Sequence, residues 1–231
     1  MVKPVIALRC RPAVVTGLCF HGVGEPGPEI GEDAASYFIS RDLFLEILDD
    51  VVERPDINLT FDDGYESDAG IVLQALVQRG LTATFFPLAG SLGRPGYVDV
   101  GGVRALAAAG MSVGSHGMRH RSWRGLDCGA ADEELTGARA VIAEAAGAPV
   151  TTAACPFGAY DRRVLRSLRR LGYRQVFTSD SRRARAGDWL QPRYSVRCRD
   201  TLASVRRDIL APPPLAERIR GAAASRVKAW R

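Results

Sequence analysis

Strand-like and helix-like segments alternate along almost the whole chain, and this alternation limits the possible folds more than any other feature. The strand-like segments are short and rich in β-branched or aromatic residues, whereas the segments between them carry apolar residues at helical spacing. The predicted strands lie at 13–20, 57–61, 82–87, 111–114, 151–155, 175–178 and 194–196. Six or seven strand–helix units without a long linker predict an α/β fold built on a parallel sheet or barrel.

The helical segments carry recognisable start and stop signals. Ser40 and Asp161 can cap the helices that follow them, because their side-chain oxygens can accept hydrogen bonds from first-turn N–H groups. Gly80, Gly110 and Gly147 stand where other helices are expected to end. The predicted helices cover the segment after Ser40 and residues 68–79, 103–109, 131–146, 161–171 and 201–210.

Length and composition fit one domain. The chain has 231 residues, of which 46% are hydrophobic and 25% charged, and barrels of this length routinely form a single domain. We therefore expect one domain over 1–231, with its core at about 15–210. Residues 211–231 are basic and weakly amphipathic, which fits a tail, a packing helix or a helix on a membrane surface.

Positive charge is concentrated late in the chain. There are 31 Lys and Arg residues against 26 Asp and Glu, and arginines crowd residues 162–185 and 218–231. Such runs of arginine most often form solvent-exposed faces of helices. The functional alternative is that these arginines attract a phosphate-bearing substrate or an anionic membrane surface. No aromatic stacking positions or recognition motif accompany the arginines, which argues against nucleic acid as a partner.

The cysteines indicate a reducing compartment. The five cysteines are scattered and form no Cys-x-x-Cys pair, which argues against both a disulfide framework and a structural zinc site. The N-terminus lacks a secretory pattern, and the apolar runs are far shorter than the ~20 residues of a spanning helix. We therefore expect a soluble, cytoplasmic protein.

Two adjacent acids, Asp62 and Asp63, directly follow the second predicted strand. Asp and Gly residues favour tight turns, so a turn after the strand is enough to explain an Asp-Asp-Gly sequence. Neighbouring carboxylates at the end of a strand repel each other, however, and neither is easily buried without a partner. The motif therefore also fits a functional site, and other residues of the chain are needed to distinguish a functional site from a simple turn.

Two of the three histidines, His116 and His120, lie four residues apart directly after a strand. A lone histidine is more often a hydrogen-bonded structural residue than a ligand. On a helical turn, however, this spacing would place both imidazoles on one side, close enough to share a cation. His21 also directly follows a predicted strand.

In a barrel, these five side chains would converge at the carboxyl ends of the strands, where such folds carry their chemistry. Two histidines and one carboxylate form a three-ligand site with an open position, which is typical of a catalytic metal. The second carboxylate would then stay free as a base. A bound cation would offset the repulsion between the two acids.

Two motifs carry a resemblance to a known family. Thr60-Phe61-Asp62-Asp63-Gly64 and His116-x-x-x-His120 resemble the first two motifs of the NodB-type polysaccharide deacetylases, carbohydrate esterase family 4. The order, spacing and strand context agree over roughly residues 15–200. The resemblance implies an irregular (β/α)7 barrel and a metal-dependent enzyme that removes acetyl groups from sugars.

The resemblance also implies roles for individual residues. Asp62 would be the general base, and Asp63, His116 and His120 would hold the metal. Zinc is expected first, with Co²⁺, Ni²⁺ or Fe²⁺ as alternatives, because two histidines and one aspartate accept each of them.

The segment from Ala154 to Asp161 resembles the third family motif, which forms one wall of the groove. The resemblance implies that the Phe157 N–H stabilises the oxyanion and that Pro156, Phe157 and Tyr160 contact the substrate. Asp188-Trp189 could echo the fourth motif and would add Trp189 to the substrate contacts, although a surface Asp-Trp pair is equally plausible.

The chain departs from the family pattern in two places. Many members carry an arginine just before the proline of the third motif to orient the base, and Ala154-Cys155 stands here instead. Arg193 lies in a strand-start pattern and is the predicted substitute. No histidine follows His120 to serve as the usual general acid.

The resemblance offers His21 as the general acid. The first and last strands of a closed barrel are neighbours, so a permuted chain can supply the same group from its N-terminal strand. The exopolysaccharide-processing members of the family show this arrangement, with a similar N-terminal histidine segment. The alternative is a structural histidine that caps the strand.

The implied reaction is hydrolysis of an N-acetyl or similar acyl group on an amino sugar or glycan. The expected substrates include phosphate- or lipid-linked sugars, nucleotide sugars, glycosides and nascent exopolysaccharide units. The alternative from another class is a non-catalytic barrel that binds a sugar or a protein partner and retains the motifs.

Overall fold

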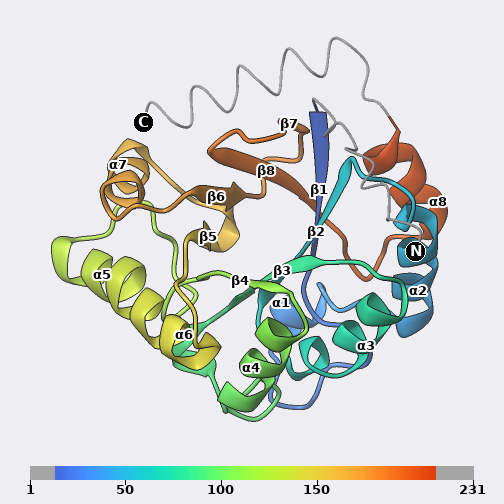
Figure 1. The fold of residues 1–231 in the computed structure, drawn as a ribbon, viewed down its shortest axis with the longest axis horizontal. Helices are drawn as coiled ribbons and strands as arrows, with labels where there is room; N and C mark the ends of the chain where they lie inside the picture. The colour runs from blue at the N-terminus through green and yellow to red at the C-terminus, as the bar shows by residue number, and fades with distance from the viewer. Residues whose placement is uncertain (1–13, 212–231) are drawn as a thin grey trace, which may run out of the picture.

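The computed structural model describes residues 14–211, so the basic segment predicted at 211–231 lies almost wholly outside the described residues. In this part of the chain, seven parallel strands form a nearly closed barrel with helices around its outside (Figure 1). Their order around the barrel is β4-β3-β2-β1-β8-β6-β5. The strands are β1 (Val14–Phe20), β2 (Ile57–Asp63), β3 (Ala83–Pro87), β4 (Ser112–Val113), β5 (Thr152–Ala154), β6 (Gln175–Thr178) and β8 (Leu190–Ser195). The predicted α/β barrel is confirmed.

The barrel closes between β4 and β5 through Ser115. This residue forms a parallel bridge with Ala153. Its N–H donates to the Thr152 carbonyl at 3.0 Å, and its carbonyl accepts from the Ala154 N–H at 2.9 Å. The seam lies one residue before His116, so closure of the barrel also anchors the start of the histidine loop.

The helices cover the outer face of the barrel (Figure 1). Both predicted caps are present: Ser40 Oγ accepts from the Leu43 N–H at 3.2 Å, and Asp161 Oδ1 accepts from the Val164 N–H at 2.9 Å. None of the helices in the described residues has the length and apolar character to span a bilayer. The α-helices are α1 (Glu32–Ala35), α2 (Arg41–Val51), α3 (Ile71–Gln78), α4 (Val100–Ala108), α5 (Cys128–Asp132), α6 (Ala138–Ala146), α7 (Arg162–Arg170) and α8 (Leu202–Ser204). The 3-10 turns are η1 (Glu66–Asp68), η2 (Ala89–Ser91) and η4 (Pro156–Gly158), and the π-helical turns are η3 (Glu133–Gly137) and η5 (Val205–Leu210).

The observed elements differ from the predicted ones in several places. Strand β8 begins at Leu190 rather than at 194, because the polar residues Gln191 and Arg193 are buried, not exposed as their type suggests. The helix predicted at 131–146 begins at Cys128 and contains the π-helical turn η3. The two-residue strand β7 (Ala184–Arg185) pairs antiparallel with β1 and is too short to show a pattern in the sequence.

Strand side chains alternate between the helix layer and the barrel interior. Phe20, Phe61 and Phe85 lie side by side on β1, β2 and β3, with ring centroids 5.3 and 4.8 Å apart. They pack with Phe44 and Leu48 of α2 in the main hydrophobic core. Because Phe20 and Phe61 face the helices, the residues that follow them, His21 and Asp62, face the inside of the barrel at its carboxyl end.

The cap of α7 gives a test of the fold. Asp161 also accepts a hydrogen bond from the Gly125 N–H at 2.9 Å through its second oxygen, so Asp161→Ala leaves two N–H groups without their acceptor. We expect the free energy of unfolding to fall by about 0.5–2 kcal/mol, measured by urea denaturation. Asp161→Asn keeps one acceptor oxygen and is the matched control. Equal losses in both variants would contradict the capping role.

Candidate active site

A cavity of about 850 Å³ lies at the carboxyl ends of the strands. The five side chains predicted to converge, at positions 21, 62, 63, 116 and 120, all line it. They come from the ends of β1 and β2 and from the loop after β4, so segments far apart in the sequence meet at one mouth of the barrel.

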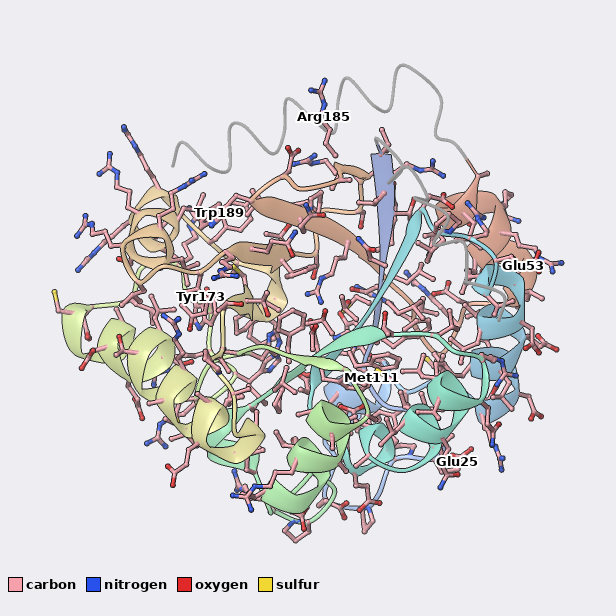
Figure 2. The ribbon with its side chains drawn as sticks, viewed as in Figure 1. Glu25, Glu53, Met111, Tyr173, Arg185 and Trp189 are labelled. Carbon is pink, nitrogen blue, oxygen red and sulfur yellow. The ribbon has the colours of Figure 1, made fainter. Side chains whose placement is uncertain are left out.

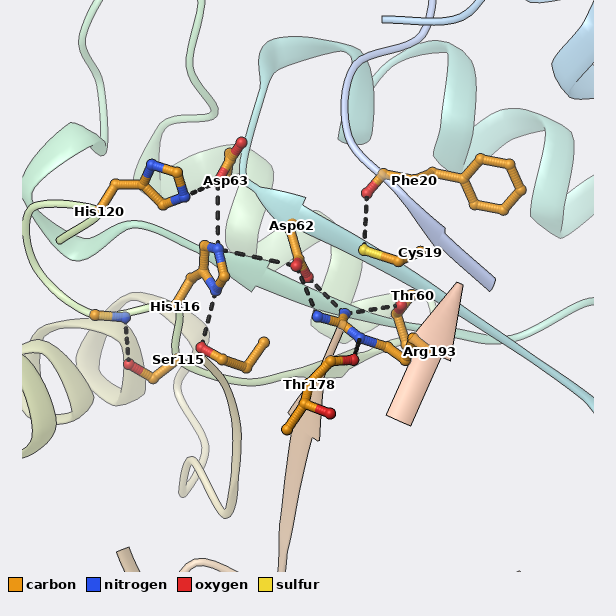
Figure 3. Close-up of polar contacts among 12 residues, drawn as sticks. Cys19, Phe20, Thr60, Asp62, Asp63, Ser115, His116, His120, Thr178 and Arg193 are labelled. Atoms are coloured by element: carbon orange, nitrogen blue, oxygen red, sulfur yellow. Dashed lines mark hydrogen bonds and ion pairs between the residues drawn. The ribbon is translucent and has the colours of Figure 1, made fainter. Parts of the chain in front are cut away.

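Arg193 forms a bidentate ion pair with Asp62 inside the barrel (Figure 3). Its two terminal nitrogens lie 2.7 and 2.8 Å from the two carboxylate oxygens of Asp62. The guanidinium also donates to Thr60 Oγ1 at 3.0 Å and to the Thr178 carbonyl at 3.3 Å. Both partners of the ion pair are buried, so Arg193 fixes the position of the Asp62 carboxylate.

The ion pair controls the charge of Asp62. Burial alone would raise the pKa of this carboxyl, but the charge of Arg193 and its hydrogen bonds outweigh burial and hold the pKa well below its usual range. The pKa of Arg193 is raised in turn, because the attraction of Asp62 outweighs the effect of burial. Asp62 is therefore ionised at neutral pH.

Asp63 leaves the strand in a different direction from Asp62. Its backbone lies in the left-handed region, with φ of 73°, which costs a non-glycine residue on the order of 1–3 kcal/mol. Gly64 follows with φ of 75°, and a Cβ there would lie 2.7 Å from a side-chain carbon of Pro87. This turn aims Asp63 at the two histidines: its Oδ1 lies 3.4 Å from Nε2 of both His116 and His120.

The Asp63 cluster fits a divalent cation. Asp63 Oδ1 is buried and has no hydrogen-bond partner among the described residues, which is costly for a carboxylate unless something else binds it. Ligand atoms of Asp63, His116 and His120 all lie within 4.8 Å of one another. His116 Nδ1 contacts the Ala154 carbonyl at 2.9 Å, which orients the ring and leaves Nε2 for a cation.

A second cluster, formed by Cys19, His21 and Asp62, has ligand atoms equally close together. It fits a cation less well, because Arg193 already occupies both oxygens of Asp62 with a positive charge. Burial also raises the pKa of the Cys19 thiol, and the thiolate is the form that binds metals. Asp63, His116 and His120 are therefore the better ligand set.

The predicted helical turn between the two histidines is wrong. Gly117 and His120 have φ of 87° and 49°, so the segment is an irregular loop rather than a helix. The loop still brings the two imidazoles together, with ring centroids 5.2 Å apart. Spacing of four residues predicted the proximity, although the backbone reaches it by another route.

His21 lies at the end of β1 in the same cavity. Its ring contacts Tyr37 at a centroid distance of 4.6 Å, and its Nδ1 has no hydrogen-bond partner among the described residues. Burial lowers the pKa of the imidazole despite the opposing charges of Asp63 and Asp62. His21 is therefore predominantly neutral at pH 7 when no metal is bound.

Phe157 is the one predicted substrate contact that lines the cavity. Its backbone has φ of 57°, its side chain is 68% exposed, and its ring lies 4.4 Å from that of His120. Its N–H makes no hydrogen bond within residues 14–211. Pro156 and Tyr160 are buried instead, and the Tyr160 hydroxyl donates to Asp180 at 2.8 Å.

The predicted substrate contact of Trp189 is wrong. Trp189 immediately precedes β8, so it lies at the amino end of that strand, at the other end of the barrel from the cavity. Its indole N–H donates to the Tyr173 carbonyl at 2.8 Å, and the Arg169 guanidinium lies 4.0 Å from its ring. Figure 2 shows Trp189 and Tyr173 together on the α7 side of the barrel. Asp188-Trp189 is thus a structural pair.

Sequence inspection missed part of the cavity wall. The Tyr37 ring packs against His21 on one side. The Arg197 guanidinium lies 4.7 Å from the centre of the same Tyr37 ring. Ser179, Ser181 and Ser195 add hydroxyl groups to the lining. Ser195 is the last residue of β8 and the others lie in loops, in both cases without a recognisable motif, so no local signal identified them.

The buried His116 and the half-buried His21 predict a pH dependence of stability. Burial lowers the pKa of both His21 and His116, so below about pH 6.5 the unfolded chain binds protons more readily than the folded protein. With chelator present, the free energy of unfolding should therefore fall as pH drops from about 7 to about 5, by up to about 1.4 kcal/mol per pH unit for each group. Urea denaturation at several pH values measures this loss. His21→Gln should flatten it, and an unchanged slope would contradict the assignment.

The Asp62–Arg193 pair predicts strong coupling. Arg193→Met leaves a buried carboxylate without its partner and should lower the free energy of unfolding by about 3–5 kcal/mol. The double variant with Asp62→Asn should lose less than the sum of the single variants in urea denaturation at pH 7. Arg54→Met, which breaks a partly exposed pair with Asp56, is the control and should cost about 1 kcal/mol or less. Additive losses at positions 62 and 193 would show that the pair is not coupled.

Comparisons with known proteins show the family and the fold of this chain. The model of the polysaccharide deacetylase family matches residues 49–176. The Bacillus subtilis (strain 168) protein YxkH is 25% identical over 122 residues, which cover 53% of this chain and 44% of YxkH. The chain thus spans less than half the length of the curated relatives that it matches.

Solved structures show the same fold at low identity. Streptococcus pyogenes deacetylase PplD superposes with a TM-score of 0.75 at 18% identity, over 87% of this chain and all of that chain. IcaB from Ammonifex degensii superposes with a TM-score of 0.67 at 23% identity, over 84% of this chain and 94% of that chain. Because the family model covers more than half of the chain, the protein belongs to the polysaccharide deacetylase family.

Proposed function

We propose that this protein is a metal-dependent deacetylase that hydrolyses the N-acetyl or a similar acyl group of an amino sugar in a glycan. The observation that carries the proposal is the buried Asp63 Oδ1, which faces two imidazoles at 3.4 Å and has no other partner in the described residues. An ionised carboxylate, Asp62, lies beside this cluster in the same cavity. Family membership supports the reaction class.

Asp63, His116 and His120 would hold the cation. A divalent metal at these ligands would polarise an acyl carbonyl and lower the pKa of water from 15.7 toward about 7. Zinc is the first choice, and Co²⁺, Ni²⁺ and Fe²⁺ also suit two imidazoles and a carboxylate. The two neutral imidazoles would leave the charge of the cation only partly compensated, which favours binding of a polar carbonyl.

The other residues would move protons and stabilise charge. Asp62, kept ionised by Arg193, takes a proton from the attacking water. The Phe157 N–H is free to donate to the developing oxyanion. His21 donates a proton to the departing amine, which would otherwise leave poorly.

The neutral state of His21 constrains the order of these steps. The imidazole has to gain a proton before it can donate one, and ligand atoms of His21 and Asp62 lie within 4.8 Å of each other. The proton taken up by Asp62 can therefore reach His21 over a short path inside the cavity. With this route, the proton that Asp62 takes from water is the proton that His21 gives to the amine, so no other proton donor is needed in a turnover.

The substrate is proposed as an acylated amino sugar or glycan. PplD is described in complex with acetate, which fits an acetyl group as the acyl group removed by a protein of this fold. A phosphate- or lipid-linked sugar stays a candidate because of the arginine-rich segments, and so does contact of residues 211–231 with a membrane surface. Cytoplasmic location stays a prediction from the sequence.

Metal content and acetate release test the proposal. Purified protein should contain a divalent metal and release acetate from N-acetylglucosamine oligomers, and chelator should abolish both. Asp62→Asn should lower kcat/KM by about 10²–10⁴-fold while metal content is retained, because Asp62 serves as the base rather than as a ligand. His116→Ala should lose the metal, and Asp42→Asn, on the exposed face of α2, is the control.

The alternative function is a non-catalytic barrel that binds a sugar or partner. Protein without metal and without hydrolysis of any acylated sugar would favour it. Full activity of Asp62→Asn would instead contradict the assignment of the base.

A further inference from the structure

The loop between the two histidine ligands is irregular, yet hydrogen bonds hold its centre from both sides. On one side, the carbonyls of Gly117 and Met118 accept from the N–H groups of Ala89 and Gly90, each at 3.0 Å. These donors belong to the region of turn η2. The backbone carbonyls therefore have partners, and the N–H groups of the loop need acceptors on the opposite side.

Glu134 supplies those acceptors. The Met118 N–H donates to Oε2 at 2.9 Å, and the Arg119 N–H donates to Oε1 at 3.1 Å. The indole N–H of Trp123 also donates to Oε2, at 3.3 Å. One carboxylate thus binds two consecutive N–H groups of the loop and the side chain of a residue just beyond it.

Glu134 is fully buried, which makes these bonds important. Its nearest cation, the Arg121 guanidinium, lies 3.8 Å from Oε1, and the Arg121 side chain is 46% exposed. A buried carboxylate is stabilised mainly by the N–H groups that donate to it when the ion pair is this loose. Loss of the carboxylate would leave the same N–H groups without acceptors in a buried place.

The local backbone is shaped for this contact. Glu134 lies in the π-helical turn η3, and such turns are frequent at functional sites. Gly117 packs directly against the carboxylate: a Cβ there would lie 2.3 Å from Oε2 of Glu134. Its φ of 87° also favours glycine. The Glu134 carboxylate therefore packs against the loop backbone only one residue after His116.

We propose that Glu134 is a positioning residue that holds the His116–His120 loop, so that both imidazoles face Asp63. This inference rests on the metal site of the proposed function, and it adds a residue outside that ligand set. Glu134 is not among the residues that line the cavity, and its hydrogen bonds reach the histidine loop through the backbone of Met118 and Arg119. Preorganised ligands bind a metal more tightly because the loop does not have to be ordered at binding.

Glu134→Gln tests the proposal. The amide keeps the size of the side chain, but one of its ends is an NH₂ donor that cannot accept from an N–H group. We expect Zn²⁺ affinity, measured by competition with a chromophoric chelator, to fall by about 10- to 100-fold. The absorption spectrum of the Co²⁺-loaded variant should also change, because it reports the coordination geometry.

Glu133→Gln is the matched control. Glu133 lies in the same turn but pairs at the surface with the Arg119 side chain at 2.8 Å. The Zn²⁺ affinity and the Co²⁺ spectrum of the Glu133→Gln variant should therefore match those of the unchanged protein. Circular dichroism checks the folding of each variant. If Glu134→Gln does not fold, Glu134→Asp, which keeps the charge but shortens the reach, replaces it with the same expectation.

The outcomes separate this inference from the proposed function. An unchanged protein that binds neither Zn²⁺ nor Co²⁺ would overturn the metal site itself. If the unchanged protein binds metal and a folded Glu134 variant binds it equally well with the same spectrum, Glu134 is not a positioning residue. Failure of both Glu134 variants to fold would make Glu134 a residue required for folding and would overturn the proposal as well.

Discussion

The buried ion pair between Asp62 and Arg193 is the interaction around which the inside of the barrel is arranged. It joins β2 to β8 across β1, with both carboxylate oxygens bound by the guanidinium. Gly17 of β1 makes room for it, since a Cβ there would lie 2.8 Å from Arg193 Cγ. A charged arginine can stay fully buried here because Asp62, Thr60 and the Thr178 carbonyl use its donors.

This pair also explains how two adjacent acids share one site. Asp62 is ionised and its charge is balanced by Arg193. Asp63, in a left-handed backbone conformation at the end of the strand, faces His116 and His120 instead. The two carboxylates are thereby assigned to different partners. One is held as a charge inside the barrel, and the other is left with an oxygen that fits a cation.

The order of strands brings the two ends of the described chain into this site. β1 and β8 are parallel neighbours, with Cys19 opposite Ser195, so His21 and Ser195 line the same cavity from opposite ends of the described chain. The histidine loop approaches from the seam between β4 and β5, where Ser115 closes the barrel. The residues of the cavity therefore come from two places, where β1 pairs with β8 and where β4 meets β5. The site can form only when the barrel closes at both of them.

The sequence by itself determined the parts that depend on local patterns. Periodicity predicted the parallel strands, and side-chain caps predicted the starts of α2 and α7. Spacing predicted that His116 and His120 come together, and positions at strand ends predicted that His21, Asp62 and Asp63 converge with them. Only the tertiary structure decided the burial of Arg193, the irregular path of the histidine loop and its contact with Glu134. It also turned Trp189 away from the cavity and placed Tyr37 against His21. These features depend on which side chains from distant strands and loops meet, because burial and hydrogen-bond satisfaction are set by neighbours in space rather than in sequence.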